Sequence, residues 1–238
     1  MRAKVVTAYV PLDVKHLTAE QYRAYYDVIE RAIGSDNVHC FRDFPLERCW
    51  LSHEPDLPLV PANPVPADRY DSPLTNVRSN VVQHNRTTWA CLAAEAEPDV
   101  DVWVWLDYGI AKQGAWRNNP ITEEVIYDFF AEVSAADRWN TIPFPGIEAL
   151  GPVFPTGNNW RFCGSTHIWP KQFLPAIDSL YKSILRTWIA DFKTVPLDLP
   201  IWALVERASD LPFRFYQAEY DASQLSNFKK EMAYDPAL

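Results

Sequence analysis

Asp107 is the residue of this sequence whose type and position most favour chemistry. It follows an apolar run, Val102–Leu106 (VWVWL), and Gly109 stands two positions further on. In open α/β sheets, ligands bind beyond the carboxyl ends of the strands. A carboxylate there can hold a divalent cation, which would neutralise a leaving diphosphate. The alternative is that Asp107 only shapes a turn, where Asp and Gly are common.

Motifs of several other enzyme classes are absent from the sequence. It has only 7 glycines, and neither the dinucleotide-binding motif G-x-G-x-x-G nor the phosphate loop G-x-x-x-x-G-K-[ST] occurs. The nucleophile motif G-x-S-x-G and the zinc motif H-E-x-x-H are also missing. The 4 cysteines form no C-x-x-C pair, which argues against a zinc ribbon or a thioredoxin-type redox site.

The composition predicts one α/β domain over residues 1–238. Hydrophobic residues make up 48% of the chain and charged residues 22%, the balance of a globular protein. The net charge of −9 opposes binding to nucleic acid or to anionic lipid, although one local site can still hold a sugar nucleotide. No apolar run approaches the roughly 18 residues of a membrane span. With no signal peptide and no disulfide pattern, a cytoplasmic location is expected.

The first part of the chain predicts a strand, a helix and a second strand. Residues 4–10 and 38–44 are short, apolar and rich in β-branched side chains. Between them Thr18 and Gln21 have the spacing of a capping box, and Gly34 is placed to end the helix. A strand–helix–strand unit of this kind indicates a parallel sheet.

Further elements position Asp107. A helix over residues 77–96 precedes a strand over 102–107, and Asn119 is expected to cap the next helix. Two proline-rich stretches, residues 52–76 and 142–155, are expected to lack regular structure and to border the same cleft as Asp107.

The last third of the chain predicts two more strands and two helices. One strand is expected within residues 160–169 and another over 211–220. A long helix is expected to begin near Pro170 or Pro175, and Asp198 to cap a short one.

The order of these elements resembles the GT-A fold of nucleotide-sugar glycosyltransferases. The strands VVTAYV, VHCFRDF and VWVWLDYGI carry the resemblance, and the last is similar to the segment that bears the D-x-D motif. The similarity is closest to the HtrL/YibB-like group of glycosyltransferases and extends from about Lys4 to Tyr220. It implies a single GT-A-like domain with a mainly parallel sheet flanked by helices.

The resemblance also implies a donor side of the site. Thr7 would meet the nucleobase or ribose, Arg78 would reach the diphosphate, and Asp107 would bind the nucleotide through a cation, Mn²⁺ or Mg²⁺. Thr7 can instead be an ordinary strand residue, and Arg78 a solvated surface residue. Gly109 stands where a full D-x-D has its second carboxylate, so the expected cation site is weakened.

On the acceptor side, the resemblance points to His167 and Asp198. His167 follows the small residues of segment 163–166 (CGST), and Asp198 precedes LPIW. In an inverting mechanism one of them would act as the base. The alternatives are a structural histidine and a plain helix N-cap.

The function implied is transfer of a sugar from a nucleotide-diphosphate donor to a glycan or other acceptor. A non-catalytic nucleotide- or glycan-binding protein on the same scaffold is the main alternative, and Gly109 favours it. A hydrolase using the same site is a third candidate, because a fold does not fix a function.

Overall fold

The structure is a computed structural model that describes residues 1–11, 18–53, 81–113, 118–136, 139–146, 161–193 and 195–228. Its strands are β1 (Ala3–Ala8), β2 (Val38–Phe41), β3 (Val102–Leu106), β4 (Ile142–Gly146), β5 (Thr166–Pro170) and β6 (Phe213–Gln217). The α-helices are α1 (Ala19–Ile33), α3 (Arg86–Ala96), α4 (Glu123–Ala135), α5 (Leu174–Phe192), α6 (Asp198–Arg207) and α7 (Ser223–Ser226). Short 3₁₀ turns are η1 (Ser35–Asn37), η2 (Leu46–Arg48), η3 (Trp50–His53), η4 (Ile110–Lys112) and η6 (Lys171–Phe173).

A mainly parallel sheet forms the centre of the fold. Four strands lie in the order β2-β1-β3-β5, and β1 is parallel to both β2 and β3, whereas β5 runs antiparallel to β3. The three strands predicted over residues 4–10, 38–44 and 102–107 are therefore neighbours in one sheet, as expected. A buried parallel strand has apolar neighbours on both faces, which explains the unbroken apolar runs.

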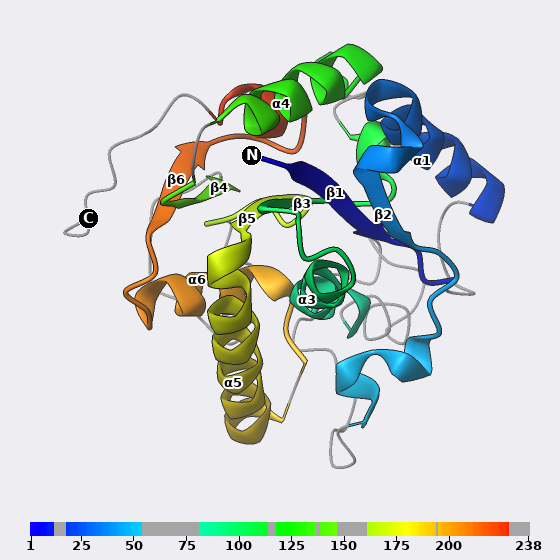
Figure 1. Ribbon diagram of the computed structural model, residues 1–238. Helices are drawn as coiled ribbons and strands as arrows, with labels where there is room; N and C mark the ends of the chain where they lie inside the picture. The colour runs from blue at the N-terminus through cyan, green and yellow to red at the C-terminus, as the bar shows by residue number, and fades with distance from the viewer. Residues whose placement is uncertain are drawn as a thin grey trace.

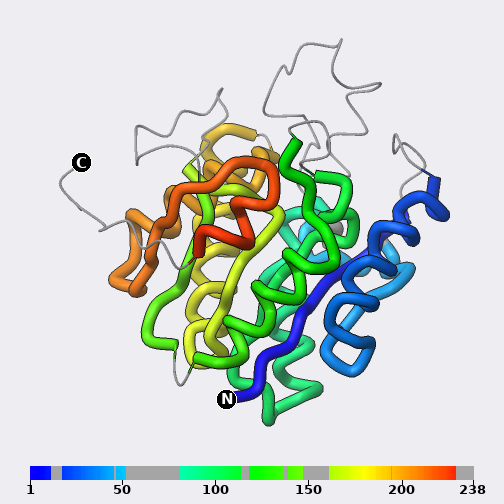
Figure 2. The backbone as a smooth tube through the Cα atoms, turned by 90° about the horizontal axis from the view of Figure 1, so that it is seen from above, coloured from blue at the N-terminus to red at the C-terminus, as the bar shows by residue number. Residues whose placement is uncertain are grey.

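Helices cover both faces of this sheet. In Figure 1, α1 and α4 lie on one side, and α3, α5 and α6 on the other. Figure 2 shows α4 between α1 and the segment that carries β6 and α7. Residues of β3 alternate between the two layers, because Trp103 and Trp105 face the α3–α5 side while Val104 faces the α1–α4 side. Among the described residues, no helix has both the length and the apolar character needed to cross a membrane.

The N-terminal half of α1 confirms the predicted capping box. The Thr18 hydroxyl accepts a hydrogen bond from the backbone N–H of Gln21 at 3.2 Å, and the Gln21 side chain accepts one from the Thr18 N–H at 2.8 Å. Gly34 ends the helix with a φ of 79°, a conformation that side chains disfavour. The predicted start of α5 at Pro175 is also confirmed, since this proline lies in its first turn.

One predicted helix is interrupted, and another begins later than expected. Of the helix expected over residues 77–96, residues 81–83 are helical, His84 and Asn85 form a turn, and α3 follows from Arg86; residues 77–80 are outside the described part. The His84 ring is fixed between the Tyr181 hydroxyl (2.7 Å) and the Pro196 carbonyl (2.8 Å). These tertiary contacts override the local helical pattern.

The cap of α4 is three residues later than expected. The Asn119 carbonyl accepts a hydrogen bond from the Ala222 N–H at 3.1 Å. Thr122 caps the helix instead, and its hydroxyl accepts from the Val125 N–H at 3.3 Å. Asn119 therefore bonds to the start of α7 and does not cap α4.

The expectation that residues 142–155 lack regular structure was wrong for residues 142–146, which form β4; residues 147–160 lie outside the described part. β4 pairs in parallel with β6 as a second sheet. The Ile142 N–H donates to Pro212 at 2.8 Å and the Gly146 carbonyl accepts from Ala218 at 2.8 Å, so even-numbered residues bond to β6. Pro143 and Pro145 occupy the alternate positions, where the ladder needs no N–H.

Candidate functional site

A pocket opens at the carboxyl ends of β1 and β3, in the place expected for Asp107. It has a volume of about 160 Å³. The Asp107 side chain is 31% exposed, so it is partly solvated, as expected. The lining consists of residues after β1, from the start of α1 and α3, and from the β3–η4 turn: Ala8, Tyr9, Val10, Tyr22, Val82, Gln83, Arg86, Trp89, Trp105, Asp107, Tyr108, Gly109 and Lys112.

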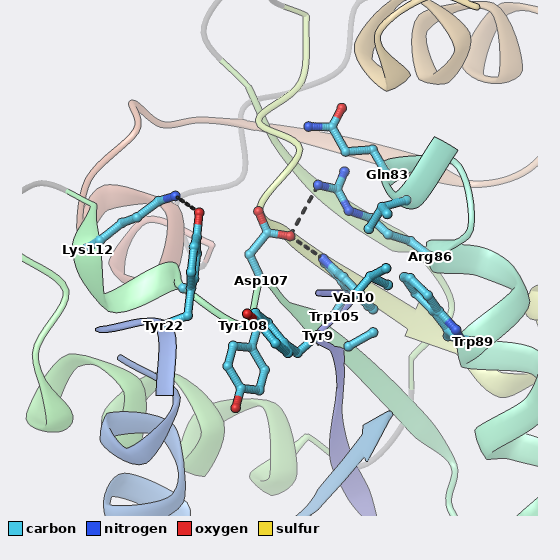
Figure 3. Close-up of a pocket in the computed structure, with 13 residues that line it drawn as sticks. Tyr9, Val10, Tyr22, Gln83, Arg86, Trp89, Trp105, Asp107, Tyr108 and Lys112 are labelled. Carbon is cyan, nitrogen blue, oxygen red and sulfur yellow. Dashed lines mark hydrogen bonds and ion pairs between the residues drawn. The ribbon is translucent and has the colours of Figure 1, made fainter. Parts of the chain in front are cut away.

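The Asp107 carboxylate is held by two donors (Figure 3). Its Oδ1 accepts a hydrogen bond from Trp105 Nε1 at 2.8 Å and one from Arg86 Nη2 at 3.2 Å. Its backbone N–H donates to the Ser165 carbonyl at 3.0 Å, which ties the turn to the segment before β5. The direction of this side chain is therefore fixed before any ligand binds, which lowers the entropy cost of recognition.

Of the two predicted neighbours of Asp107, the structure describes Thr7 only. Arg78 lies outside the described residues. Thr7 belongs to β1, where Val5 and Tyr9 face the α1–α4 layer while Val6 and Ala8 face the layer of Arg86 and Trp105. Thr7 shares the parity of Val5, so it is on the opposite face of the sheet from Asp107. It is fully buried, and its hydroxyl has no hydrogen-bond partner among the described residues.

Arg86 joins Asp107 to Asp198. Its Nη1 bonds to Asp198 Oδ2, and its Nη2 reaches Asp107. The Arg86 and Asp198 side chains are only 6% and 5% exposed. Burial acts to lower the pKa of Arg86, but the two carboxylates outweigh it and the pKa lies above its usual value. Burial raises the pKa of Asp198, while Arg86 acts to lower it.

Sequence reasoning missed Arg86, although the chain contains a signal for it. Arg86 is spaced i+3, i+4 and i+7 from Trp89, Ala90 and Ala93, which are the buried face of α3. A charged side chain on the apolar stripe of a helix needs a buried partner of opposite charge. Asp198 was expected as a cap of α6; it is the first residue of that helix, but its carboxylate bonds to Arg86.

Gly164 allows this ion pair to form. A Cβ atom at position 164 would lie 2.8 Å from Asp198 Oδ2 and 3.0 Å from Arg86 Nη1. The absence of a side chain at this position of segment 163–166 therefore leaves room for the buried pair.

His167 lies beneath the site, inside an aromatic core. Its ring centroid is 4.4 Å from that of Phe144 and about 5 Å from those of Trp169 and Trp202. Burial, followed by the charge of Arg86, lowers its pKa well below the usual value, so the ring is neutral. His167 and Asp198 are not among the residues that line the pocket.

The other wall of the pocket is formed by Tyr22 and Lys112, across Asp107 from Arg86 (Figure 3). Lys112 Nζ is 3.5 Å from the Tyr22 hydroxyl and 5.1 Å from the centre of its ring. Tyr9 lies between this wall and Tyr108, with ring centroids 5.9 Å from Tyr22 and 4.9 Å from Tyr108. The pocket thus combines a polar floor with aromatic walls.

The described residues form no ready set of ligands for the divalent cation that the resemblance implied. They contain no group of three or more His, Cys, Asp or Glu side chains able to hold a metal ion. Asp107 already accepts bonds from a cationic and a neutral donor. A Cβ at Gly109 would lie 3.0 Å from the Tyr22 ring, so this tyrosine occupies the space beside the position of the missing carboxylate.

Comparison with protein-family models and with curated proteins gives no match. Among solved structures, the fold is similar to the crystal structure of a glycosyltransferase involved in the glycosylation of the major capsid of PBCV-1. The TM-score is 0.52 at 11% sequence identity, and the alignment covers 92% of this chain and 82% of that chain. At this identity the likeness concerns the fold alone: a mixed α/β fold with a mainly parallel sheet, found also in a glycosyltransferase.

Proposed function

We propose that this protein transfers a sugar from a nucleotide-diphosphate donor to a glycan or other acceptor at the Asp107 pocket. The observation that carries the proposal is the partly exposed Asp107 carboxylate, fixed by Arg86 and Trp105 at the carboxyl ends of two parallel strands. Ligands of open α/β sheets bind at this place. The likeness in fold to a glycosyltransferase supports the same activity.

The chemistry of the lining suits a sugar nucleotide. A fixed carboxylate accepts hydrogen bonds from sugar or ribose hydroxyls, and the tyrosine rings offer flat faces for a sugar or a base. The volume of about 160 Å³ is below the roughly 300–1,000 Å³ of ordinary ligand pockets, so we expect this pocket to take one portion of the donor.

A non-catalytic binding protein is the second candidate, and the placement of Asp198 and His167 favours it. Asp198 is bound to Arg86 and His167 is enclosed by aromatic rings, so neither side chain faces the pocket as a free base. On this alternative the chain holds a nucleotide or glycan without turning it over.

A thermal-shift panel of nucleotide sugars, with and without Mn²⁺, followed by a turnover assay, tests both candidates. A ligand at 100 times its Kd stabilises the fold by about 2.7 kcal/mol. We expect Asp107→Asn to abolish this shift, because it removes the charge but keeps the shape, and to change the stability of the free protein by less than about 1 kcal/mol. Asp191→Asn, an exposed position on α5, is the matched control.

Each outcome separates the candidates. Binding with turnover supports the transferase, and binding without turnover supports the binding protein. If no nucleotide sugar shifts the wild-type protein, or if Asp107→Asn binds as tightly as the wild type, the site proposed here is wrong.

A further inference from the structure

We infer that the pocket recognises the diphosphate of its donor with a protein cation, Lys112, and without a divalent metal ion. This inference rests on the proposed function and specifies how the same site meets the charge of its ligand. In the turn that follows β3, position 107 has a carboxylate and position 109 is a glycine with no side chain.

Position 109 offers no ligand for a cation, and the space beside it is filled. A Cβ there would be 3.0 Å from Tyr22 Cε1 and 3.2 Å from Tyr22 Cδ1. Contacts this short require the ring to move, so a carboxylate at this position would compete with Tyr22 for the wall of the pocket. The chain has an aromatic ring and an ammonium group on this wall, where a metal site needs oxygen ligands.

Asp107 is the one carboxylate among the described residues that line the pocket, and Arg86 and Trp105 already donate to it. Its Oδ1 is 3.2 Å from Arg86 Nη2 and 2.8 Å from Trp105 Nε1. A divalent cation at this carboxylate would be repelled by the buried guanidinium next to it. The Asp107–Arg86–Asp198 group, which has two carboxylates and one guanidinium, therefore forms a polar floor in which Arg86 already offsets part of the charge of Asp107.

Lys112 is the cation of the pocket that remains available. Its side chain is exposed, it lines the pocket, and it forms no ion pair with a carboxylate among the described residues. The Tyr22 hydroxyl and ring hold its ammonium group at the pocket wall. An ammonium group in this position is a point charge suited to phosphate oxygens.

Calorimetric titration of UDP, GDP, ADP, CDP and dTDP, in EDTA and in Mn²⁺, tests the inference. We expect at least one diphosphate to bind with a Kd that differs by less than about threefold between the EDTA and the Mn²⁺ buffer. Lys112→Gln should weaken binding by about tenfold or more in EDTA, the range expected for loss of a charged hydrogen bond. Lys112→Arg should restore most of the affinity.

Lys171→Gln is the matched control. It makes the same charge change at the other end of the sheet, because Pro170 pairs with Val102 at the start of β3, and it should bind as the wild type does. Binding that requires Mn²⁺, or Lys112→Gln binding as tightly as the wild type, overturns the inference and leaves the proposed function standing. If no diphosphate binds in either buffer, the proposed function itself fails.

Discussion

Two buried arginines, Arg86 and Arg161, pair with carboxylates of the same helix, α6. Arg161 binds Glu206 through two parallel hydrogen bonds of 2.8 and 3.0 Å, and the two side chains are 4% and 2% exposed. Its guanidinium lies 3.9 Å from the centre of the Phe215 ring. Arg86 is buried to the same degree, but it divides its donors between Asp198 and Asp107, and Asp107 faces the pocket.

The two arginines differ in whether a partner carboxylate is exposed. Both side chains of the Arg161–Glu206 pair are buried, whereas Arg86 has one buried partner and one partner that faces the pocket. Arg161 and Glu206 satisfy each other in a bidentate pair away from the pocket, which is the arrangement of a structural contact. Arg86 holds one buried carboxylate and presents another to solvent, so a ligand that binds Asp107 acts on the whole group. Burial of a charged arginine is therefore not by itself evidence of a binding site.

The largest effects expected are those of Arg161→Met and Arg86→Met. Each leaves a buried carboxylate without its partner, which costs about 3–5 kcal/mol of unfolding free energy. At a temperature where both variants are folded, Arg161→Met should keep its affinity for a nucleotide ligand and Arg86→Met should lose it, because Arg86, unlike Arg161, bonds to Asp107. Urea unfolding and calorimetric titration measure the two effects.

A double variant checks the reason for the loss of stability. Replacing Arg161 by Met together with Glu206 by Leu removes both charges, and should recover most of the stability. If Arg86→Met binds ligand normally, the contrast drawn between the two arginines does not hold.

The second largest effect expected is a loss of folding stability in acid. It comes from two buried histidines, His84 and His167, whose pKa values are both lowered in part by Arg86. Burial and the charge of Arg86 lower the pKa of His84 to about 4, and lower that of His167 well below its usual value. Below pH 6.5 the unfolded chain takes up protons at both rings that the folded chain excludes. The two neutral rings therefore cost the folded protein no stability above pH 6.5, and the free energy of unfolding decreases as the pH falls toward 4. Asp198, whose pKa is raised by burial, acts in the opposite sense as the pH falls through that raised pKa.

Urea midpoints measured between pH 7.5 and 4.5 test this. Two excluded protons correspond to a slope of about 2.7 kcal/mol per pH unit, and His84→Gln should remove about half of it. Arg161→Met should leave the slope unchanged, since Arg161 is not among the groups that shift either pKa. An unchanged slope in His84→Gln would show that the acid sensitivity has another origin.

The smallest effect expected is that of Gly164→Ala, at about 1–3 kcal/mol. The added Cβ would lie 2.8 Å from Asp198 Oδ2, so the ion pair must shift and ligand affinity should fall with stability. Gly34→Ala is the control, because its cost comes from a φ of 79° in open space far from the pocket. If both variants bind ligand as the wild type does, Gly164 does not position the Arg86 group.

The sheet could be predicted from the sequence because the pattern that defines it is local. Residues 4–10 and 102–107 are apolar runs of strand length, and Asp107 marks where the second one ends. The prolines at 143 and 145 misled the prediction, since their effect depends on which N–H groups a neighbouring strand requires, and this is set by tertiary structure.

The candidate site could be predicted only in part. Asp107 was found from its place at the end of a strand, and its partner Trp105 is two residues away. Its other partner, Arg86, lies 21 residues from Asp107 and 112 residues from Asp198, so no local pattern of the sequence indicated this group. Arg86 stands within a helical pattern, where its charge was the only sign of a buried partner. Thr7 was predicted from the position of a strand end without regard to which face it occupies. Its burial shows that neighbouring residues of a strand point to opposite faces of the sheet, so a shift of one residue exchanges a position near the pocket for one in the core.

The two prolines of β4 also determine where the main sheet stops. An edge strand with free N–H and C=O groups is a template on which another chain can add as a further strand. β4 contacts β5 but forms no ladder with it, because Pro143 and Pro145 face away from β6 and have no N–H to donate. The protein thus covers the β5 edge with a strand of its own that does not extend the main sheet.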